Sequence, residues 1–407
     1  MTGILSLISD RPVRLGVAGL GRAFMLMLPT FRNDPRVRLT ACAAPRRSSR
    51  ETFLRDFGGT AHDRVEALAE DPSVDAIYIA TPHQMHRAHA EVALAAGKHV
   101  LLDKPLCVDL EDGLAIAKAA REAGRHVIVG PSHSFDPQVL LARELIESGR
   151  FGNVRMIHAF NYTDFLYRPR RPEELDTAEG GGVLFSQGVH QIDIVRLLGG
   201  GLVRSVRAST GKWDAARPTE CAYSAHLTFA SGAFASLTYS GFAHFDSDEY
   251  CGWVGELGRD KNPDSYGAAR KALAAGLSPE QEAALKSTRT YGSAGEDPLP
   301  QHNEHFGSVI VSCDGADLRL TPDGLWIYGH TEREFLPLPV TDVPRRTVID
   351  ALYQAVMDNR PPVQTTEWGL ASLELCHAIL ESASGAREIE LKHQTPVLPA
   401  ANRYFCA

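Results

Sequence analysis

Residues 13–24 read VRLGVAGLGRAF and decide the fold class of this chain. A short apolar run, Val13–Ala18, is followed at once by two glycines and the start of a helix. A turn of this kind lets the backbone approach the pyrophosphate of a dinucleotide at a helix N-terminus. Phe24 stands where the usual fingerprint has its third glycine, and a GxG also occurs in tight turns that bind nothing. The predicted cofactor contacts of this turn are Gly19, Leu20, Gly21, Arg22 and Ala23.

Strand-like and helix-like segments alternate from Val13 to Gly130. Such an alternation of short buried strands with helices is typical of βαβ units in a parallel, doubly wound sheet. The sequence therefore predicts an α/β Rossmann domain over residues 1–135. The expected strands are Val13–Ala18, Val37–Ala43, Asp75–Ala80, His99–Leu102 and His126–Gly130, and the expected helices are Ser49–Phe57, Val65–Glu70, Met85–Ala96 and Leu110–Ala123.

The pattern changes after Phe151, where strands become longer and alternate between apolar and polar residues. Alternation of this kind is typical of an antiparallel sheet with one covered face. We expect residues 136–407 to form an α+β domain with a large, mainly antiparallel open sheet, an insertion at about 245–303 and C-terminal helices that pack back. The expected strands are Val154–Tyr162, Val203–Gly211, Ala222–Phe229, Ala233–Tyr239, Ser308–Ser312 and Asp317–Leu320, and the expected helices are Gln138–Ser148, Gly188–Leu198, Tyr266–Ala275, Pro279–Ser287, Arg346–Asp358 and Glu367–Ser384.

The bulk composition limits the classes of partner. A net charge of −8 argues against a nucleic-acid-binding surface, which needs a basic excess. The seven cysteines are scattered singly without a CxxC pair, which is typical of reduced thiols in the cytoplasm. No run approaches the ~20 apolar residues that span a bilayer, so no membrane contact is expected.

The end of the second strand bears on which nucleotide is bound. Ala44 occupies the position where an acid would bind the ribose 2′-hydroxyl of NAD, and Arg46 and Arg47 follow. Without that acid a 2′-phosphate meets no repulsion, and guanidinium groups nearby could bind it. Both arginines could equally be solvated surface charges. The sequence leaves NAD and NADP open as the cofactor.

Two further strand ends carry polar residues. Ala80-Thr81-Pro82-His83 leaves one strand, and His86 and His89 follow on a helix. Each three-residue step turns the side chain about 60° round the helix, and no carboxylate or thiolate completes a ligand set, so no metal is expected. Cofactor contact is the favoured role for Ala80, Thr81, Pro82, His83 and His86.

The next strand ends in Asp103-Lys104-Pro105, at the edge of a parallel sheet where ligands bind, and Asp103 and Lys104 are also predicted cofactor contacts. Farther along, Gly180-Gly181-Gly182 opens a segment that runs through Gln187 into a helix with His190 and Asp193. The last two lie at i and i+3, and a histidine beside a carboxylate can act as a general base. Each of these features has a purely structural alternative: a surface lysine, or a buried histidine–aspartate pair.

Together these stretches resemble the Gfo/Idh/MocA oxidoreductases, and the likeness covers nearly the whole chain. Leu102-Asp103-Lys104-Pro105 is similar to the family's (E)KP motif, and Gly188–Asp193 is similar to its GxHxxD motif. The resemblance implies that Lys104, His190 and Asp193 are the catalytic residues. The departures are Asp103 for the usual Glu, Ser186 where many members have Asp, and Phe24 in the glycine turn.

Within the family, residues 17–29, 181–196 and the acidic stretch Asp246–Glu249 look most like the phthalate 4,5-cis-dihydrodiol dehydrogenase branch. The resemblance implies hydride transfer from a secondary carbinol to the nicotinamide, with His190 accepting the hydroxyl proton and Lys104 donating to the oxygen. It also implies a homodimer or homotetramer built on the second sheet. The predicted substrate contacts are Lys104, Arg168, Arg170, Arg171, Gln187, His190 and Asp193.

Several alternatives remain open. The three arginines would suit an anionic ring, such as 4,5-dihydro-4,5-dihydroxyphthalate, but they also suit a solvated basic turn. A polyol or sugar substrate of the inositol type is a second possibility. A non-catalytic dinucleotide sensor is a third, although such a sensor has no use for Lys104, His190 and Asp193 as a proton-transfer set.

Overall fold

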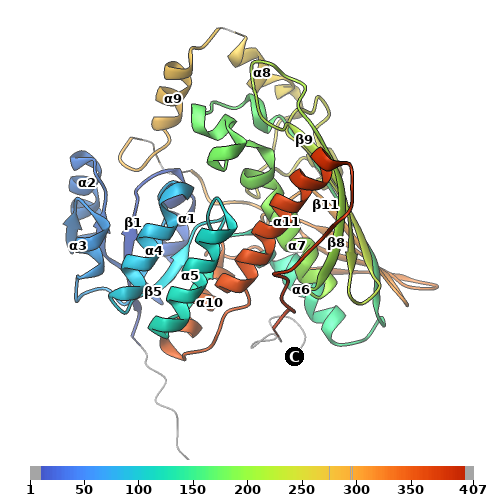
Figure 1. The fold of residues 1–407 in the computed structure, drawn as a ribbon, viewed down its shortest axis with the longest axis horizontal. Coiled ribbons are helices and arrows are strands. Elements are labelled where there is room, and N and C mark those ends of the chain that lie inside the picture. The colour runs from blue at the N-terminus through green and yellow to red at the C-terminus, as the bar shows by residue number, and fades with distance from the viewer. Residues whose placement is uncertain (1–10, 275, 294, 296, 399–407) are drawn as a thin grey trace, which may run out of the picture.

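The computed structural model describes residues 11–398 except 275, 294 and 296, so Cys406 lies outside the described residues. Two sheets, each with its own helices, lie side by side (Figure 1). The first is a six-stranded parallel sheet in the order β3-β2-β1-β4-β5-β6, and the second has nine strands. Both the Rossmann domain and the open second sheet that the sequence predicts are therefore confirmed.

The strand order of the first sheet reverses between β1 and β4, and this reversal determines where a ligand site is expected. Ligands bind beyond the carboxyl ends of the strands at such a switch point. The central strands are apolar on both faces, and the residues of β4 and β5 are all buried between helices. Its strands are β1 (Val13–Ala18), β2 (Val37–Ala43), β3 (Thr60–His62), β4 (Ala76–Ile79), β5 (His99–Leu102) and β6 (Val127–Val129); its helices are α1 (Arg22–Asn33), α2 (Arg47–Phe57), α3 (Val65–Ala69), α4 (His86–Ala95) and α5 (Leu110–Ala123).

The short edge strand β3 was not predicted, because its three residues, Thr60–His62, carry no apolar run. The helix expected from Met85 begins instead at His86, after a separate 3₁₀ turn over His83–Met85. A helix from the far end of the chain, α10 (Arg346–Met357), completes this domain. Its apolar face packs into the same core as β1 and α1 through Val348, Ile349 and Leu352.

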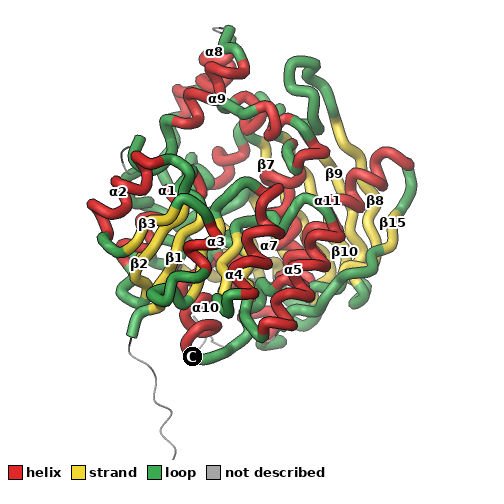
Figure 2. The backbone as a smooth tube through the Cα atoms, turned by 60° about the vertical axis from the view of Figure 1, so that its left-hand side comes forward, coloured by secondary structure: helices red, strands yellow, loops and turns green. Residues whose placement is uncertain are grey.

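The second sheet has the order β14-β13-β12-β11-β7-β10-β9-β8-β15, and all its neighbours are antiparallel except β7 and β10. Helices α6, α7 and α11 cover one face, and Figure 2 shows α7 and α11 beside the strands. The strands are β7 (Val154–Tyr162), β8 (Val203–Gly211), β9 (Ala222–Phe229), β10 (Phe234–Ser240), β11 (Ser308–Cys313), β12 (Asp317–Thr321), β13 (Gly324–Tyr328), β14 (Arg333–Pro337) and β15 (Ile389–Glu390); the helices are α6 (Pro137–Glu147), α7 (Val189–Gly199) and α11 (Thr366–Gly385).

The sequence pattern did not predict β13, β14 and β15, which lie toward the two edges of this sheet, where the strands are short and partly exposed. On the open face, large apolar side chains such as Met156 and Phe234 are exposed. None of the described helices is both long and apolar enough to cross a membrane.

The insertion carries two short helices, α8 (Ala268–Leu273) and α9 (Pro279–Ser287), with α8 beginning and ending inside the range expected for it. After α9 the chain descends to the first domain and lies near β1 (Figure 1). There the Tyr291 ring packs edge-on against Phe24 at 5.2 Å, and its backbone N–H donates to the Leu20 carbonyl at 3.3 Å. The insertion therefore touches both domains.

Candidate active site

A cavity of about 990 Å³ lies between the two domains. It receives side chains that follow strands of the first sheet, side chains from the start of α7, and side chains from the insertion. Lys104 and His190, which stand 86 positions apart in the sequence, both line it. The other predicted site residues on its wall are Arg22, Ala23, His83, Asp103, Arg170 and Gln187.

The glycine turn has the geometry that a dinucleotide requires. Gly19 has φ +93°, and a Cβ there would lie 2.8 Å from the Ala80 carbonyl oxygen, so only glycine fits between β1 and β4. A Cβ at Gly21 would meet nothing within 4 Å, which leaves open space at the N-terminus of α1. The missing third glycine is explained by packing, because Phe24 faces Tyr291 of the insertion. These features fit a pyrophosphate against the turn.

The remaining cofactor candidates separate into two groups. His83 lines the cavity, whereas His86 is buried and bonds the carbonyls of Thr81 and Pro105 at 3.0 Å each. Burial lowers the pKa of His86 to about 4, against the opposing effect of the backbone carbonyls, and the ring links two strand ends without lining the cavity. The Thr81 hydroxyl is hydrogen bonded to His89 at 2.9 Å.

At the end of β2, Ala44 is buried and its carbonyl accepts from Arg50. Arg46 is exposed and donates to the Thr290 hydroxyl of the insertion at 3.3 Å. Arg47 instead pairs with Glu51 one helical turn along α2. Of the two arginines, Arg46 is therefore the one whose side chain lies between the end of β2 and the insertion.

Lys104 is fixed by a hydrogen bond from its ammonium to the Ser186 carbonyl at 2.7 Å. This contact joins the end of β5 to the turn that precedes α7, so it ties the catalytic candidates of the two domains together. Burial lowers the pKa of Lys104, against the opposing charge of Asp103. Burial also raises the pKa of Asp103 to about 6. A buried lysine whose ammonium is held in place is a good hydrogen-bond donor to a developing oxyanion.

His190 is buried, and its Nδ1 has no hydrogen-bond partner among the described residues. Burial lowers its pKa well below the ordinary value, and the nearby charges of Lys104, His133 and Arg345 act in the same direction. The ring is therefore neutral at physiological pH and keeps a lone pair free. This is the state in which an imidazole accepts a proton.

Asp193 is not brought to the cavity. Its carboxylate accepts a hydrogen bond from the Trp368 indole of α11, and the guanidinium of Arg196 lies over the same indole at 3.9 Å. Residues three apart on a helix point about 60° from each other, so His190 can face the cavity while Asp193 faces α11. In this structure Asp193 contacts neither His190 nor the cavity, and the expectation that it is a catalytic and substrate-contacting residue has no support in the geometry.

The three candidate arginines also have different positions. Arg168 pairs with Asp164 at 3.1 Å, and the backbone N–H of Arg171 donates to Glu174 in a capping interaction. Neither side chain lies on the cavity wall, whereas that of Arg170 does. The predicted basic turn therefore contributes one cation to the cavity and not three.

Arg170 lies where positive charge exceeds negative charge. Its guanidinium stacks on the Phe165 ring at 3.6 Å, and its buried Nε has no hydrogen-bond partner among the residues that the structure describes. Glu174, 3.7 Å away, also pairs with Lys286 of α9, so two cations share a single carboxylate. Burial lowers the pKa of Arg170 to about 10, which leaves it charged at neutral pH.

Several residues that line the cavity were not predicted from the sequence. His133, 4 % exposed, follows β6 at the same sheet edge as Lys104, so the strand-end argument could have found it. Arg345, just before α10, bonds Glu304 at 2.9 Å. His133, Asp136 and Glu304 are close enough together to hold a metal ion, but Glu304 already pairs with Arg345 and we assign none. Glu256 and Lys286 belong to the insertion and match no motif.

Comparison with known proteins identifies the class. Residues 13–131 match the oxidoreductase family with an NAD-binding Rossmann fold, and residues 139–259 match the GFO/IDH/MocA C-terminal domain. The chain therefore belongs to the Gfo/Idh/MocA oxidoreductase family, as its two motifs predicted. It is an NAD(P)-dependent dehydrogenase with Lys104 and His190 facing one cavity.

Relatives agree with this placement. The chain is 47% identical, over 91% of its length and 94% of the relative's, to a 1-carboxy-3-chloro-3,4-dihydroxycyclohexa-1,5-diene dehydrogenase of Comamonas testosteroni. A solved structure described as a dehydrogenase from Bordetella bronchiseptica is 38% identical, with a TM-score of 0.89 over 93% of this chain and all of that one. A Bordetella pertussis dehydrogenase solved with NADH shares the fold at 21% identity and a TM-score of 0.66, covering 95% of this chain and 99% of that one.

Proposed function

We propose that this protein oxidises an aromatic cis-dihydrodiol that carries a ring carboxylate. The observation that carries this proposal is the surplus positive charge of Arg170 and Lys286 in the cavity that also holds Lys104 and His190. A substrate carboxylate would neutralise that charge, and Arg170 offers its Nε–H, which no described residue accepts. The printed name of the Comamonas relative describes a substrate of this chemistry, a carboxylated dihydroxycyclohexadiene.

The chain's own residues have complementary roles in the oxidation. His190 accepts the proton of one ring hydroxyl, and the Lys104 ammonium donates a hydrogen bond to the same oxygen as it gains negative charge. The bound nicotinamide supplies a hydride acceptor for the carbinol hydrogen. The product ketone then tautomerises to a catechol: the neighbouring hydroxyl-bearing carbon loses its proton and the ketone oxygen gains one. The gain of aromaticity drives the reaction forward.

We further propose an oligomeric state, a cellular location and a choice of cofactor for this oxidation. The open face of the second sheet presents exposed apolar side chains, including Met156 and Phe234, and would pair with another copy of the chain in a homodimer or homotetramer. The six described cysteines are unpaired thiols, which suits the cytoplasm. Arg46 at the end of β2 leaves NADP as well as NAD acceptable.

The test is a substrate panel followed by absorbance of the reduced cofactor. We expect turnover of carboxylated cis-dihydrodiols, weaker turnover of the uncarboxylated cis-dihydrodiol, and little with inositol. In Arg170→Met, KM for the carboxylated substrate should rise about tenfold to a hundredfold, the scale of a buried charge contact. KM for the uncarboxylated diol is the control and should not change. Preference for inositol, or an equal effect of Arg170→Met on both diols, would contradict the proposal.

A further inference from the structure

His133 stands between two carboxylates on the cavity wall. Its Nδ1 lies 2.7 Å from an Asp136 oxygen, and its Nε2 lies 3.6 Å from a Glu256 oxygen. A neutral imidazole has one N–H and one nitrogen lone pair. If His133 were neutral, its lone pair would point at one of the two carboxylates, and the two would repel each other. The doubly protonated ring avoids this. The contacts therefore select the imidazolium form of His133.

The same ring touches the proposed proton acceptor. The rings of His133 and His190 meet edge to face with centroids 4.8 Å apart, and Phe306 packs on both of them at 5.1 Å. No described acid is hydrogen bonded to His190. The charged groups that act on it are all cationic: Lys104 after β5, His133 after β6 and Arg345 before α10.

We propose that His133 is a positioning residue of the oxidation: held between Asp136 and Glu256, it keeps a positive charge against the ring of His190 and thereby keeps His190 neutral and oriented to accept the substrate proton. This inference rests on the role of His190 in the proposed function. It extends that function by naming a residue that acts on the base without touching the substrate.

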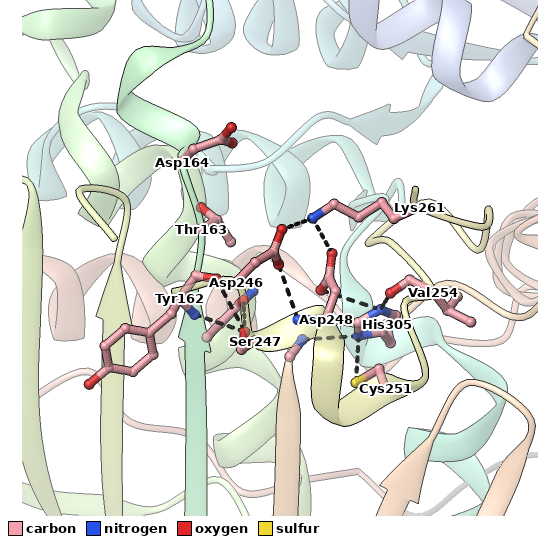
Figure 3. Close-up of polar contacts among 12 residues, drawn as sticks. Tyr162, Thr163, Asp164, Asp246, Ser247, Asp248, Cys251, Val254, Lys261 and His305 are labelled. Carbon is pink, nitrogen blue, oxygen red and sulfur yellow. Dashed lines mark hydrogen bonds and ion pairs between the residues drawn. The ribbon is translucent and has the colours of Figure 1, made fainter. Parts of the chain in front are cut away.

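The insertion holds this arrangement in place. Figure 3 shows Asp246 and Asp248 both directed at Lys261, with His305 between Asp248, Cys251 and the Val254 carbonyl. The Ser247 hydroxyl accepts from the Tyr162 backbone at the end of β7. The backbone N–H of His305 donates to the Glu256 carbonyl at 3.2 Å. The network thus fixes Glu256 and Phe306, the next residue after His305, relative to His133.

The charges around His133 support its cationic form. Burial alone would lower its pKa, but Asp136 and Glu256 outweigh burial and raise the pKa to about 10. Asp136 is itself near Glu304 and Arg345, whose charges oppose each other. Burial alone would raise the pKa of Glu256, but His133, Arg168 and Lys104 outweigh burial and lower it to about 2. His133 is therefore charged across the range in which His190 would work.

The experiment measures the pKa of His190 directly, from the pH dependence of hydrogen–deuterium exchange at its ring Cε1, read by peptide mass spectrometry. In the wild-type protein this pKa should lie below the ordinary value of about 6.5. His133→Gln keeps hydrogen-bonding groups but removes the charge, so the pKa of His190 should rise by about one unit. Glu256→Gln weakens the hold on the His133 proton and should give a smaller rise.

His99→Gln is the matched control, because His99 is a buried histidine at the opposite end of β5 from Lys104. It should leave the His190 titration unchanged. Phe306→Leu loosens the packing of both rings without a charge change, so it should lower kcat but not move the acid limb of kcat/KM. In His133→Gln that limb should move to higher pH with any alcohol the enzyme oxidises.

An unchanged His190 titration in His133→Gln overturns the proposal, as does a shift of equal size in His99→Gln. A variant that has unfolded is recognised because it no longer binds reduced NAD and all its histidines titrate near about 6.5. Failure of the dihydrodiol proposal has a different signature, namely no turnover of those substrates. The exchange measurement needs no turnover and gives its result either way.

Discussion

The two walls of the cavity are built in different ways. On one wall, Lys104 and His190 are set by regular elements, the end of β5 and the first turn of α7. On the other, Glu256 and Lys286 belong to an insertion whose position depends on separate ion pairs and on its contacts with both domains. In our proposals the first wall holds the proton-transfer groups, and the second adds charges that favour a carboxylated substrate and act on the base. Changes in the first wall should therefore affect turnover, and changes in the second should affect preference, pH and cofactor retention.

The largest effect is expected on the first wall. Lys104→Ala and His190→Ala should each lower kcat by ~10²-fold or more, because each removes a proton-transfer group or an oxyanion donor. Affinity for the cofactor should stay nearly intact, which fluorescence titration with reduced NAD would show. Because both residues serve one step, the double variant should be little worse than the worse single variant. Full activity in either single variant removes that residue from the mechanism.

Gly21→Val is expected to act almost as strongly, but on binding. Gly21 has φ −84°, so a valine fits the backbone without strain, and its side chain would enter the open space in which we place the pyrophosphate. Dinucleotide affinity should fall about tenfold or more, which is ~1.4 kcal/mol or more of binding free energy. Thermal stability without cofactor is the control and should change little. Unaltered affinity would place the pyrophosphate elsewhere.

The division between the two walls also separates the residues that could be predicted from the sequence from those that could not. Lys104 was predictable because side chains after parallel strands converge at one sheet edge, and His133 was missed although the same argument applies to it. Phe24 looked like a defect of the glycine turn, yet it is explained by Tyr291, more than 250 positions away. Glu256, Lys286 and Tyr291 carry no spacing signal, since only the tertiary position of the insertion brings them to the site.

For Asp193 the sequence motif and the structure indicate different roles, and a variant can distinguish them. The motif suggests catalysis, whereas the structure pairs Asp193 with Trp368 beside the buried Arg196. Asp193→Asn removes a buried charge that compensates Arg196, so it should cost ~1.5–3 kcal/mol of unfolding free energy while kcat falls less than about threefold. Denaturant unfolding and steady-state kinetics on one preparation would show both. A loss of kcat near that of His190→Ala, with stability retained, would restore the catalytic role.

The smallest effect is expected where the insertion meets the glycine turn. The Tyr291 hydroxyl donates to the Asp56 carboxylate at 2.7 Å, while the ring packs on Phe24 and Phe57. Tyr291→Phe keeps the ring and loses one hydrogen bond, which should cost ~0.5–1.5 kcal/mol of unfolding free energy. Because the ring still supports Phe24 below the turn, cofactor affinity should change less than about threefold, measured by titration with reduced NAD.

The pH dependence of this loss distinguishes the hydrogen bond from packing. The hydrogen bond from Tyr291 holds the pKa of the Asp56 carboxyl below its ordinary value, with smaller contributions from Arg55 and Arg32. A carboxyl whose pKa is lowered by folding contributes stability above its unfolded pKa of about 3.9 and loses that contribution as pH falls through the folded value. The difference between wild type and Tyr291→Phe should therefore be full at pH 7 and shrink below about pH 4. Tyr291→Ala is the contrast, because it also removes the ring from Phe24 and should weaken cofactor binding at every pH. Equal loss in Tyr291→Phe at pH 7 and pH 3 would mean that packing, and not the carboxylate, holds the insertion on the turn.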